Sequence, residues 1–425
     1  MRTALFGSVL AGVLALASPA LAQDSAVTSG IVAYQAGDPV EALRRLDAAL
    51  ADPGSLKAKN VARAYLFRAR ARIDAFSKAS ALSESPDPAA LPSAMDDLLA
   101  ARAADDARLA SQIEEQIDRL APLLVLAAAA ATGDTAATAI PWLDKVERAR
   151  PDDYRTTHIR AQLRLEAAGG YADASDAEIS AIRADLQATL TRYASHPPPV
   201  PDPTIPTVHY QLAAIARLRD ADIDAALRAI ALGLEAAEAQ EKALAKASVP
   251  EADAATLRAR LLTITEQLRT FELDCYLHAP DRREEGIAKL EAATKRDPGN
   301  PILWAALASL LEPTDPDRAV ASWEKAHELE PTGFATVFNL GALYTNRAAA
   351  LLQQANALDD HAKAAALTKK ANAEMEQAVA WLEKAHALDP TDLTVVKGLE
   401  QAYIQLERME DFTRMKEVRK KLQGG

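Results

Sequence analysis

Hydrophobic positions recur at helical spacing along most of the chain, and the most regular pattern lies between residue 280 and the C-terminus. Three segments align there without gaps: 287–293 before Asp297-Pro298, 320–326 before Glu330-Pro331, and 379–385 before Asp389-Pro390. Each segment has a large apolar residue eight positions before the proline, an alanine five before it and a small residue twelve before it. Offsets of three and four place these positions on one helical face. The pattern predicts three equivalent helices, each ended at its proline.

The aligned positions combine small and large side chains on one stripe. In chain order the small, large and alanine positions are Gly286, Leu290 and Ala293, then Ala319, Trp323 and Ala326, then Ala378, Leu382 and Ala385. Small residues allow a neighbouring helix to approach closely, so each of these helices is expected to pack against a partner helix. The segments 303–311 and 337–344 are the candidates for those partners, and they follow Pro298 and Pro331 directly.

The partner segments carry a known signature. Leu340, Gly341 and Tyr344 resemble the W-x-x-L-G-x-x-Y motif of the tetratricopeptide repeat, with Val337 in the Trp place, and the earlier segment keeps Trp304, Leu307 and Ala308. Over roughly residues 280–425 the chain resembles this family, in particular secreted bacterial members with one elongated helix pair. The resemblance implies an all-α fold, a right-handed superhelix of stacked antiparallel helix pairs. It also implies a concave surface lined by the first helix of each pair.

One repeat is longer than the others. Pro298 and Pro331 are 33 residues apart, whereas Pro331 and Pro390 are 59 apart, so the second repeat carries about 26 extra residues. These residues fill 346–376, a stretch rich in Ala, Leu, Gln and Lys with a break at 356–360. We expect both helices of this pair to be about 13 residues longer, forming a hairpin at about 345–376 that projects roughly 20 Å.

Upstream the repeat pattern is weaker, and it suggests three regions after the N-terminal leader. Residues 23–195 are expected to form a degenerate helical-repeat region, 196–206 a Pro-rich connector, and 207–425 the C-terminal array. The connector, His196-Pro-Pro-Pro-Val-Pro-Asp-Pro203 followed by Pro206, favours an extended conformation. Two alternatives remain for it: a long loop between helices, or a docking motif for a proline-binding module.

Several local signals place elements within these regions. Residues 31–50 predict a helix pair with its turn at Gly37-Asp38-Pro39, and 139–151 repeats the C-terminal offsets with Ala139, Leu143 and Pro151. Ser248-Val249-Pro250 predicts the start of a long helix that ends near Leu277. A Ser- and Pro-rich stretch at about 78–94 is expected to be a loop with helices on both sides.

The first 22 residues predict a secretory signal. Arg2 precedes an apolar run from Ala4 to Ala17, and small residues near Ala22 suit cleavage after that residue. The alternative, a membrane-spanning helix, needs about 20 apolar residues. We expect a periplasmic or secreted protein whose mature chain has no membrane span. Its single cysteine, Cys275, allows no internal disulfide and is expected to be a buried small hydrophobic residue.

The charge balance restricts the kinds of partner. The chain has 48 Lys and Arg against 60 Asp and Glu, and loss of Arg2 with the leader changes the net charge from −12 to about −13. An acidic protein disfavours nucleic acid and anionic lipid as partners. We therefore expect another envelope or secreted protein as the partner, without nucleic acid. Lys416, Arg419, Lys420 and Lys421 make the last helix basic, which suits either the helix C-terminus or an acidic partner.

The sequence offers no motif for catalysis or for a cofactor. It has no Gly-rich phosphate loop, no G-x-S-x-G and no H-E-x-x-H. The acidic run 220–224 resembles the start of a calcium loop, but Ala225 and Ala231 replace the required Gly and Glu, so helix capping is the expected role. His327 and His386 occupy equivalent repeat positions. We expect no enzyme, no metal and no cofactor.

The family resemblance also implies which residues face a partner. Transferred to this chain, the concave positions of the first helices are Phe338, Ala342, Thr345 and Asn346, followed by Lys397, Gln401 and Gln405. The carboxylate-clamp subgroup of the family needs a larger set of cationic and amide residues, of which this chain supplies Lys397 and Asn346. The tryptophans are expected in the core.

The leading hypothesis is a non-catalytic scaffold that binds a partner segment in its groove. A carrier for a small ligand or glycan held between the two arrays is the alternative, and a hydrolase within 23–195 is a third.

Overall fold

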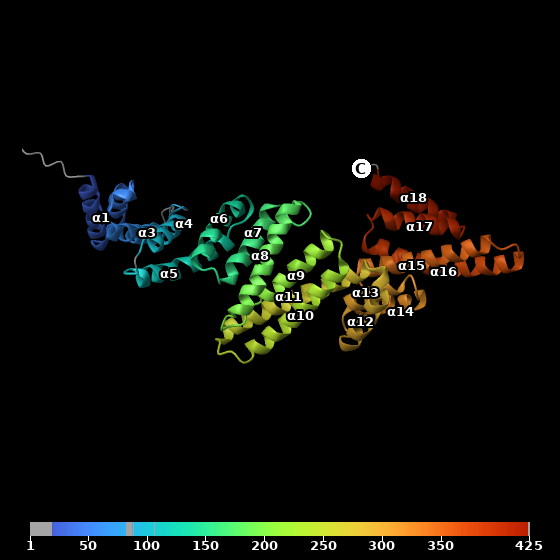
Figure 1. Ribbon diagram of the computed structural model, residues 1–425. Coiled ribbons are helices and arrows are strands. Elements are labelled where there is room, and N and C mark those ends of the chain that lie inside the picture. The colour runs from blue at the N-terminus through green and yellow to red at the C-terminus, as the bar shows by residue number, and fades with distance from the viewer. Residues whose placement is uncertain (1–18, 82–86, 88, 106, 424–425) are drawn as a thin grey trace, which may run out of the picture. The chain divides into compact units, whose positions relative to one another are not determined.

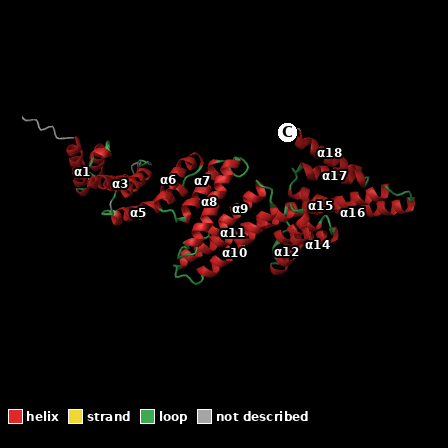
Figure 2. Ribbon diagram, viewed as in Figure 1, coloured by secondary structure: helices red, strands yellow, loops and turns green. Residues whose placement is uncertain are grey.

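The computed structural model describes residues 19–81, 87, 89–105 and 107–423 of the 425-residue chain, and in these residues it contains α-helices and short 3-10 turns but no strand (Figure 2). The chain divides into two compact units, Met1–Leu268 and Arg269–Gly425. Most of the expected signal lies outside the described residues, and Pro19 begins the first helix. Of the helices in the described part, none combines the length and apolar character that crossing a bilayer requires.

Unit 1 is a succession of antiparallel helix pairs (Figure 1). Its helices are α1 (Pro19–Gln35), α2 (Pro39–Ala49), α3 (Ala58–Ala81), α4 (Ala90–Ala104), α5 (Ala110–Ala129), α6 (Ala136–Ala149), α7 (Tyr154–Ala167), α8 (Asp176–Ser195), α9 (Thr204–Leu218), α10 (Ile223–Leu244) and α11 (Glu251–Leu277), the last of which crosses into unit 2. The predicted turn at Gly37-Asp38-Pro39 separates α1 from α2, and Asp38 caps α2 through the backbone N–H of Glu41. The long helix predicted after Pro250 is α11.

The Pro-rich segment does not separate two arrays. It lies inside unit 1, where it joins α8 to α9, and α9 already begins at Thr204. Ile182 and Leu186 of α8 share one core with Val208 and Ile215 of α9, so the helices on either side of the segment pack together. The expected connector is therefore corrected to a loop between helices, and the division of the chain falls instead within α11, at Leu268.

The Ser- and Pro-rich loop expected at 78–94 is shorter than the composition suggested. Helix α3 continues to Ala81, and α4 begins at Ala90, so Pro92 and Ser93 are helical. Proline is tolerated in the first turn of a helix because the N–H it lacks would have no intrahelical partner there. The apolar side chains of α4, such as Met95 and Leu98, are fully buried against the core of unit 1, which stabilises the helix.

Unit 2 contains the repeats that the sequence pattern indicated. Its helices after α11 are α12 (Arg283–Arg296), α13 (Pro301–Leu311), α14 (Pro316–Leu329), α15 (Phe334–Asn356), α16 (His361–Leu388), α17 (Leu393–Gln405) and α18 (Met409–Gln423). The second helices α12, α14 and α16 each end one residue before the acidic residue of an acidic-Pro pair. The expected fold class, an all-α solenoid of stacked antiparallel helix pairs, is confirmed.

Small and large residues interlock in the register that the repeats predicted. Leu382 of α16 is 2% exposed and lies against Gly341 of α15, where an added Cβ would be 2.7 Å from the leucine Cδ2. Gly398 of α17 faces the other methyl group of Leu382, with 3.4 Å to an added Cβ. The alanines of the stripe, among them Ala378 and Ala385, are fully buried. The glycines therefore let both first helices approach one leucine closely.

The elongated pair is α15 with α16. These helices have 23 and 28 residues, against 11 and 14 in α13 and α14. They pack against each other, and in Figure 1 the hairpin extends beyond α17 and α18. Asp360 caps α16 by accepting hydrogen bonds from the backbone N–H groups of Ala362 and Lys363, which fixes the turn.

The tryptophans are less uniformly buried than expected. Trp323 is 3% exposed, and its indole N–H donates to Glu312 at 2.9 Å. Trp142, Trp304 and Trp381 are only partly buried. The indole of Trp304 donates to the carbonyl of Pro298, and Trp381 lies against the ring of His327 with the centroids 5.0 Å apart. Trp304 lies at the border of the core, where its polar N–H reaches an acceptor.

Candidate functional site

Helix α17 presents two of the predicted partner-binding residues to solvent. Lys397 and Gln401 are exposed, while Val396, Leu399 and Tyr403 of the same helix are buried in the core of unit 2. Lys397 and Gln401 are four residues apart, so they lie on one face. No described residue forms an ion pair or hydrogen bond with them. This face is therefore free to contact another molecule.

The predicted partner-binding residues of α15 differ in exposure and in their contacts. Asn346 is exposed, but the hydroxyl of Thr345 donates to the carbonyl of Gly341 at 2.8 Å and is occupied within its own helix. Phe338 stacks on Phe334, with ring centroids 6.1 Å apart. Since α15 contacts α17 as well as α16, the two sets of predicted positions are on neighbouring helices. Ala342 is partly buried.

Gln405 has a structural contact. Its side-chain N–H donates to the amide oxygen of Asn372 on α16 at 3.3 Å, which ties α17 to the elongated hairpin. Of the seven predicted residues, Asn346, Lys397 and Gln401 thus remain exposed and uncommitted, and we call these three the first-helix face. The other four predicted residues are partly buried or bonded within the fold: Phe338, Ala342, Thr345 and Gln405.

The features that the sequence offered for other chemistry have structural roles. Asp222 caps α10 by accepting from the backbone N–H of Ala225 at 2.8 Å, and Asp220 pairs with Arg183. Cys275 is fully buried. In the basic last helix Arg419 donates to Glu400 of α17 at 2.9 Å. Within the part of the chain that the structure describes, no three His, Cys, Asp or Glu side chains are placed to hold a metal ion.

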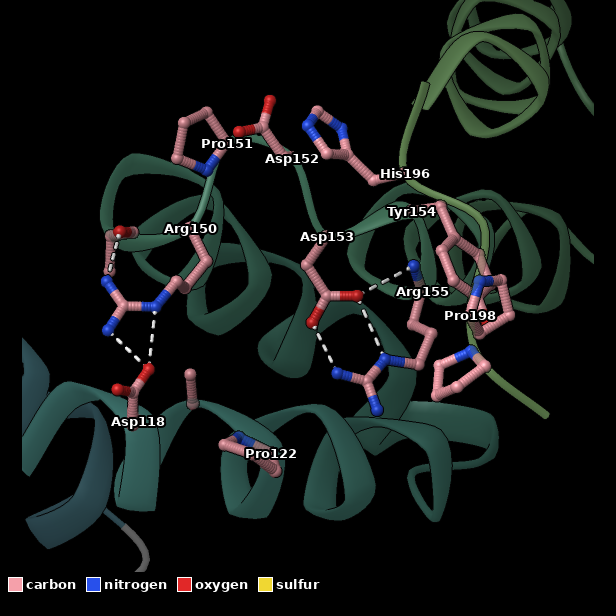
Figure 3. A pocket seen from close by; sticks show the side chains of 13 residues that line it. Asp118, Pro122, Arg150, Pro151, Asp152, Asp153, Tyr154, Arg155, His196 and Pro198 are labelled. Atoms are coloured by element: carbon pink, nitrogen blue, oxygen red, sulfur yellow. Dashed lines mark hydrogen bonds and ion pairs between the residues drawn. The ribbon is translucent and has the colours of Figure 1, made fainter. Parts of the chain in front are cut away.

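Unit 1 contains a cavity that no sequence motif predicts. Its volume is about 620 Å³, and three segments line it (Figure 3). Helix α5 contributes Asp118 and Pro122, the turn between α6 and α7 contributes residues 149–155, and the Pro-rich loop contributes His196, Pro198 and Pro199. These segments are distant in sequence, and Figure 3 shows their side chains converging on one space.

Arg150 forms the α5 side of the cavity together with two carboxylates. Its guanidinium donates to Asp118 Oδ1 at 2.5 and 3.0 Å, and to Glu114 Oε2 at 2.7 Å. The carbonyl groups of Ala149 and Glu114 accept its two remaining N–H groups. Burial alone would lower the pKa of Arg150, but the bonds to Asp118 and Glu114 outweigh it and raise the pKa. Arg150 therefore stays charged and has no free donor.

The α7 side holds one paired and one unpaired carboxylate. Asp153 caps α7 by accepting from the backbone N–H of Arg155, and its carboxylate also accepts from the Arg155 guanidinium at 2.8 and 2.9 Å. These bonds raise the pKa of Arg155 despite its partial burial. Asp152 is exposed, and no described residue donates to its carboxylate. The cavity thus has one carboxylate with both oxygens available.

The Pro-rich loop, which lines the cavity with His196, Pro198 and Pro199, is held in place by Asp202. The hydroxyl of Tyr154 donates to Asp202 Oδ2 at 2.7 Å, and the backbone N–H of Asp202 donates to Gln240 of α10 at 3.1 Å. Burial would raise the pKa of Asp202, but hydrogen bonds from Thr204 and Tyr154 overcome it, so the pKa is lowered. Asp202 follows the exposed Pro199, which lines the cavity.

Part of the signal for this cavity was present in the sequence. Pro151 ends a helix that has the repeat offsets, and 196–203 is rich in proline. Pro122 lies inside α5, where a proline breaks a backbone hydrogen bond and marks an irregular site. The sequence did not predict that Pro122, Pro151 and the Pro-rich segment lie close together, because no local rule connects these positions.

No protein-family model matches the chain, and no curated protein matches it. Among solved structures it is similar to yeast Tom70, with 14% identity over 94% of this chain and 92% of that one and a TM-score of 0.29. It is also similar to the TPR domain of P58(IPK), with 16% identity, coverage of 91% and 99%, and a TM-score of 0.26. A chain of the Naa15/Naa10 complex bound to HypK-THB has 13% identity, coverage of 94% and 63%, and a TM-score of 0.30.

The class of the protein is defined by its own helix pairs: it is a helical-repeat solenoid with exposed helix faces and, in unit 1, an open cavity.

Proposed function

We propose that this protein is a non-catalytic scaffold of the bacterial cell envelope that binds a segment of another protein on the first-helix face. The observation that supports the proposal most directly is the division of α17 into two faces. One face supplies Val396, Leu399 and Tyr403 to the core, and the other leaves Lys397 and Gln401 exposed. A rigid helix with polar side chains that the fold does not use suits recognition of a partner segment.

Site-specific crosslinking tests the proposal. A photoreactive residue is placed at Gln401, and a matched control places it at Gln377, an exposed glutamine on the second helix α16. We expect one protein adduct from the Gln401 position after irradiation of intact cells. Lys397→Glu should reduce its yield about threefold or more, because the variant reverses a charge beside the crosslinker. No adduct at Gln401, or the same adducts from both positions, would contradict the proposal.

Export is a separate part of the proposal. The basic start at Arg2, the apolar run and the small residues before Gln23 support a cleavable signal. Mass spectrometry of the protein from an osmotic-shock fraction should give a chain that begins at Gln23. An uncleaved chain that starts at Met1 and stays with the cytoplasmic fraction would disprove export while leaving the crosslinking result intact.

A further inference from the structure

The mature N-terminus that the signal predicts lies within helix α1. The helix begins at Pro19, so cleavage after Ala22 removes its first four residues and leaves Gln23 as the first residue of the helix. Gln23 is partly buried, and no described residue donates to its side-chain amide oxygen. That oxygen therefore does not tie the Gln23 side chain to the rest of the fold.

The next residue, Asp24, is anchored to the start of α3. It is buried, and its Oδ1 accepts from the side-chain N–H of Asn60 at 2.7 Å and from the backbone N–H of Lys57 at 3.3 Å. Its Oδ2 lies 3.4 Å from the Lys57 ammonium. On the same face of α1, Val27 and Ile31 are buried in an apolar core of unit 1. The shortened helix thus keeps its packing contacts from its second residue onward.

A free α-amine at Gln23 would place a positive charge at the positive end of this helix. The first backbone N–H groups of a helix have no intrahelical partner, and the helix dipole is positive at that end, so a cation there is unfavourable. The nearby carboxylate of Asp24 already accepts from Asn60 and pairs with Lys57. A neutral terminus suits the start of the mature helix better than a charged one.

On the basis of the proposed export, we propose that Gln23 is a modification site, where the new N-terminus closes to pyroglutamate and so removes a destabilising charge from the start of α1. The neutral α-amine attacks the side-chain carbonyl carbon Cδ, and an N–Cδ bond forms. The bond from Cδ to the amide nitrogen breaks, and this nitrogen takes up the proton of the attacking amine and leaves as ammonia. The reaction needs no oxidant, reductant or further reactant. The product is a five-membered lactam without a charge.

The mass of the N-terminal peptide from the exported full-length protein tests the proposal. Primary amines are dimethylated directly in the osmotic-shock fraction, because a dimethylated α-amine can no longer cyclise during later handling. Trypsin then releases residues 23–44, which end at Arg44. We expect this peptide to be about 17 Da lighter than the form with free glutamine, the mass of one ammonia, and to carry no label.

Gln23→Asn is the matched control. It keeps a side-chain amide at the same position, but its cyclisation would require a strained four-membered ring. The exported variant should therefore retain its α-amine and carry the dimethyl label.

Hydrogen exchange measures what the ring does to the helix. A reference form with free Gln23 is made from a fusion that is cut directly before this residue, and it is studied before it cyclises. In the cyclised form the backbone amides of residues 27–31 should exchange about twofold to fivefold more slowly, because no cation then opposes the helix dipole. The amides of α17 in unit 2 should exchange equally in both forms.

A chain that begins at Gln23 and carries a dimethylated α-amine overturns the proposal and leaves export intact. A chain that begins at Met1 overturns export and the modification together. Equal exchange of α1 in the cyclised and free forms also overturns the proposal, since the ring would then remove no destabilising charge. The crosslink at Gln401 is measured separately and depends on none of these results.

Discussion

Units 1 and 2 are both built from antiparallel helix pairs, yet their interiors are filled by different side chains. In unit 2 the pairs interlock through small and large apolar residues, as at Gly341 and Leu382. Among the described residues of that unit, Glu400 is the one charged side chain that is buried. Unit 1 also has apolar cores, but it additionally buries the charged residues Asp97, Arg160 and Asp185.

The charged groups of unit 1 join successive helices. Arg160 of α7 donates to Asp185 of α8 at 2.6 and 3.0 Å and to Asp144 of α6 at 2.8 Å, and it also pairs with Glu147. Arg164 donates to the other oxygen of Asp185. Each such contact requires one particular partner at one distance. Apolar interlocking needs only a small residue opposite a large one, so it can be repeated along a chain and leave a visible signature.

The largest expected effect tests whether unit 1 depends on its buried ions. Asp185→Ala leaves Arg160 with fewer partners in a site where both side chains are about 10% exposed or less. We expect a loss of about 3 kcal/mol in the free energy of unfolding of unit 1, since breaking a buried pair typically costs 3–5 kcal/mol. The hydrogen-exchange rates of the backbone amides in α7 and α8 should rise as this free energy of unfolding falls.

The control for that change is Asp220→Ala. Asp220 pairs with Arg183, and both side chains are 38% exposed. An exposed pair contributes less than about 1 kcal/mol, so this variant should remain close to the wild-type protein. Equal losses from the two variants would mean that burial of the ions is not what stabilises unit 1.

A second test uses acid, which should affect unit 1 through His158. Burial lowers the pKa of this histidine from 6.5 to about 4, against the opposing charge of Asp202, and no described residue bonds its Nε2. A lowered pKa means that the folded state favours the neutral ring. The contribution of neutral His158 to the free energy of unfolding is therefore complete above pH 6.5, and it is lost as the pH falls toward 4.

Between pH 7 and pH 4.5 this one group should remove about 2–3 kcal/mol from the stability of the wild-type protein. His158→Gln should lack that part of the pH dependence, whereas His278→Gln, at an exposed position in unit 2, should keep it. Denaturant unfolding at several pH values measures the difference. Parallel profiles for the wild type and His158→Gln would rule out a buried neutral histidine.

The smallest expected effect tests the interlocking in unit 2. Gly341→Ala would place a Cβ 2.7 Å from Leu382 Cδ2 and 2.8 Å from its Cγ, so the leucine or the helix must shift. Such overpacking costs about 1–3 kcal/mol, partly offset by the better helix propensity of alanine. We expect a net loss of about 1–2 kcal/mol, measured as a shift of the denaturant midpoint.

Gly398→Ala supplies the matched change on the other side of the same leucine. Its Cβ would lie 3.4 Å from Leu382, an ordinary contact, so alanine should be neutral or stabilising by up to about 1 kcal/mol. If both alanine variants were stabilising, close approach at Gly341 would not explain the glycine there.

Local signals in the sequence were sufficient for most helices of unit 2. The acidic-Pro pairs ended α12, α14 and α16, and the 59-residue spacing between Pro331 and Pro390 revealed the long hairpin. Helix periodicity could do this because it depends on residues three or four positions apart, which every stretch of chain contains.

Contacts between distant segments were decided only by the tertiary structure. Composition alone suggested that the Pro-rich segment separates two arrays, but the bonds of Asp202 to Tyr154 and Gln240 bind it within unit 1. The cavity likewise joins Asp118 to a turn more than 30 residues later. The sequence by itself determined the helices and their repeat register. Which charged groups meet between them depends on how those helices pack, because a single ion pair leaves no periodic trace along the chain.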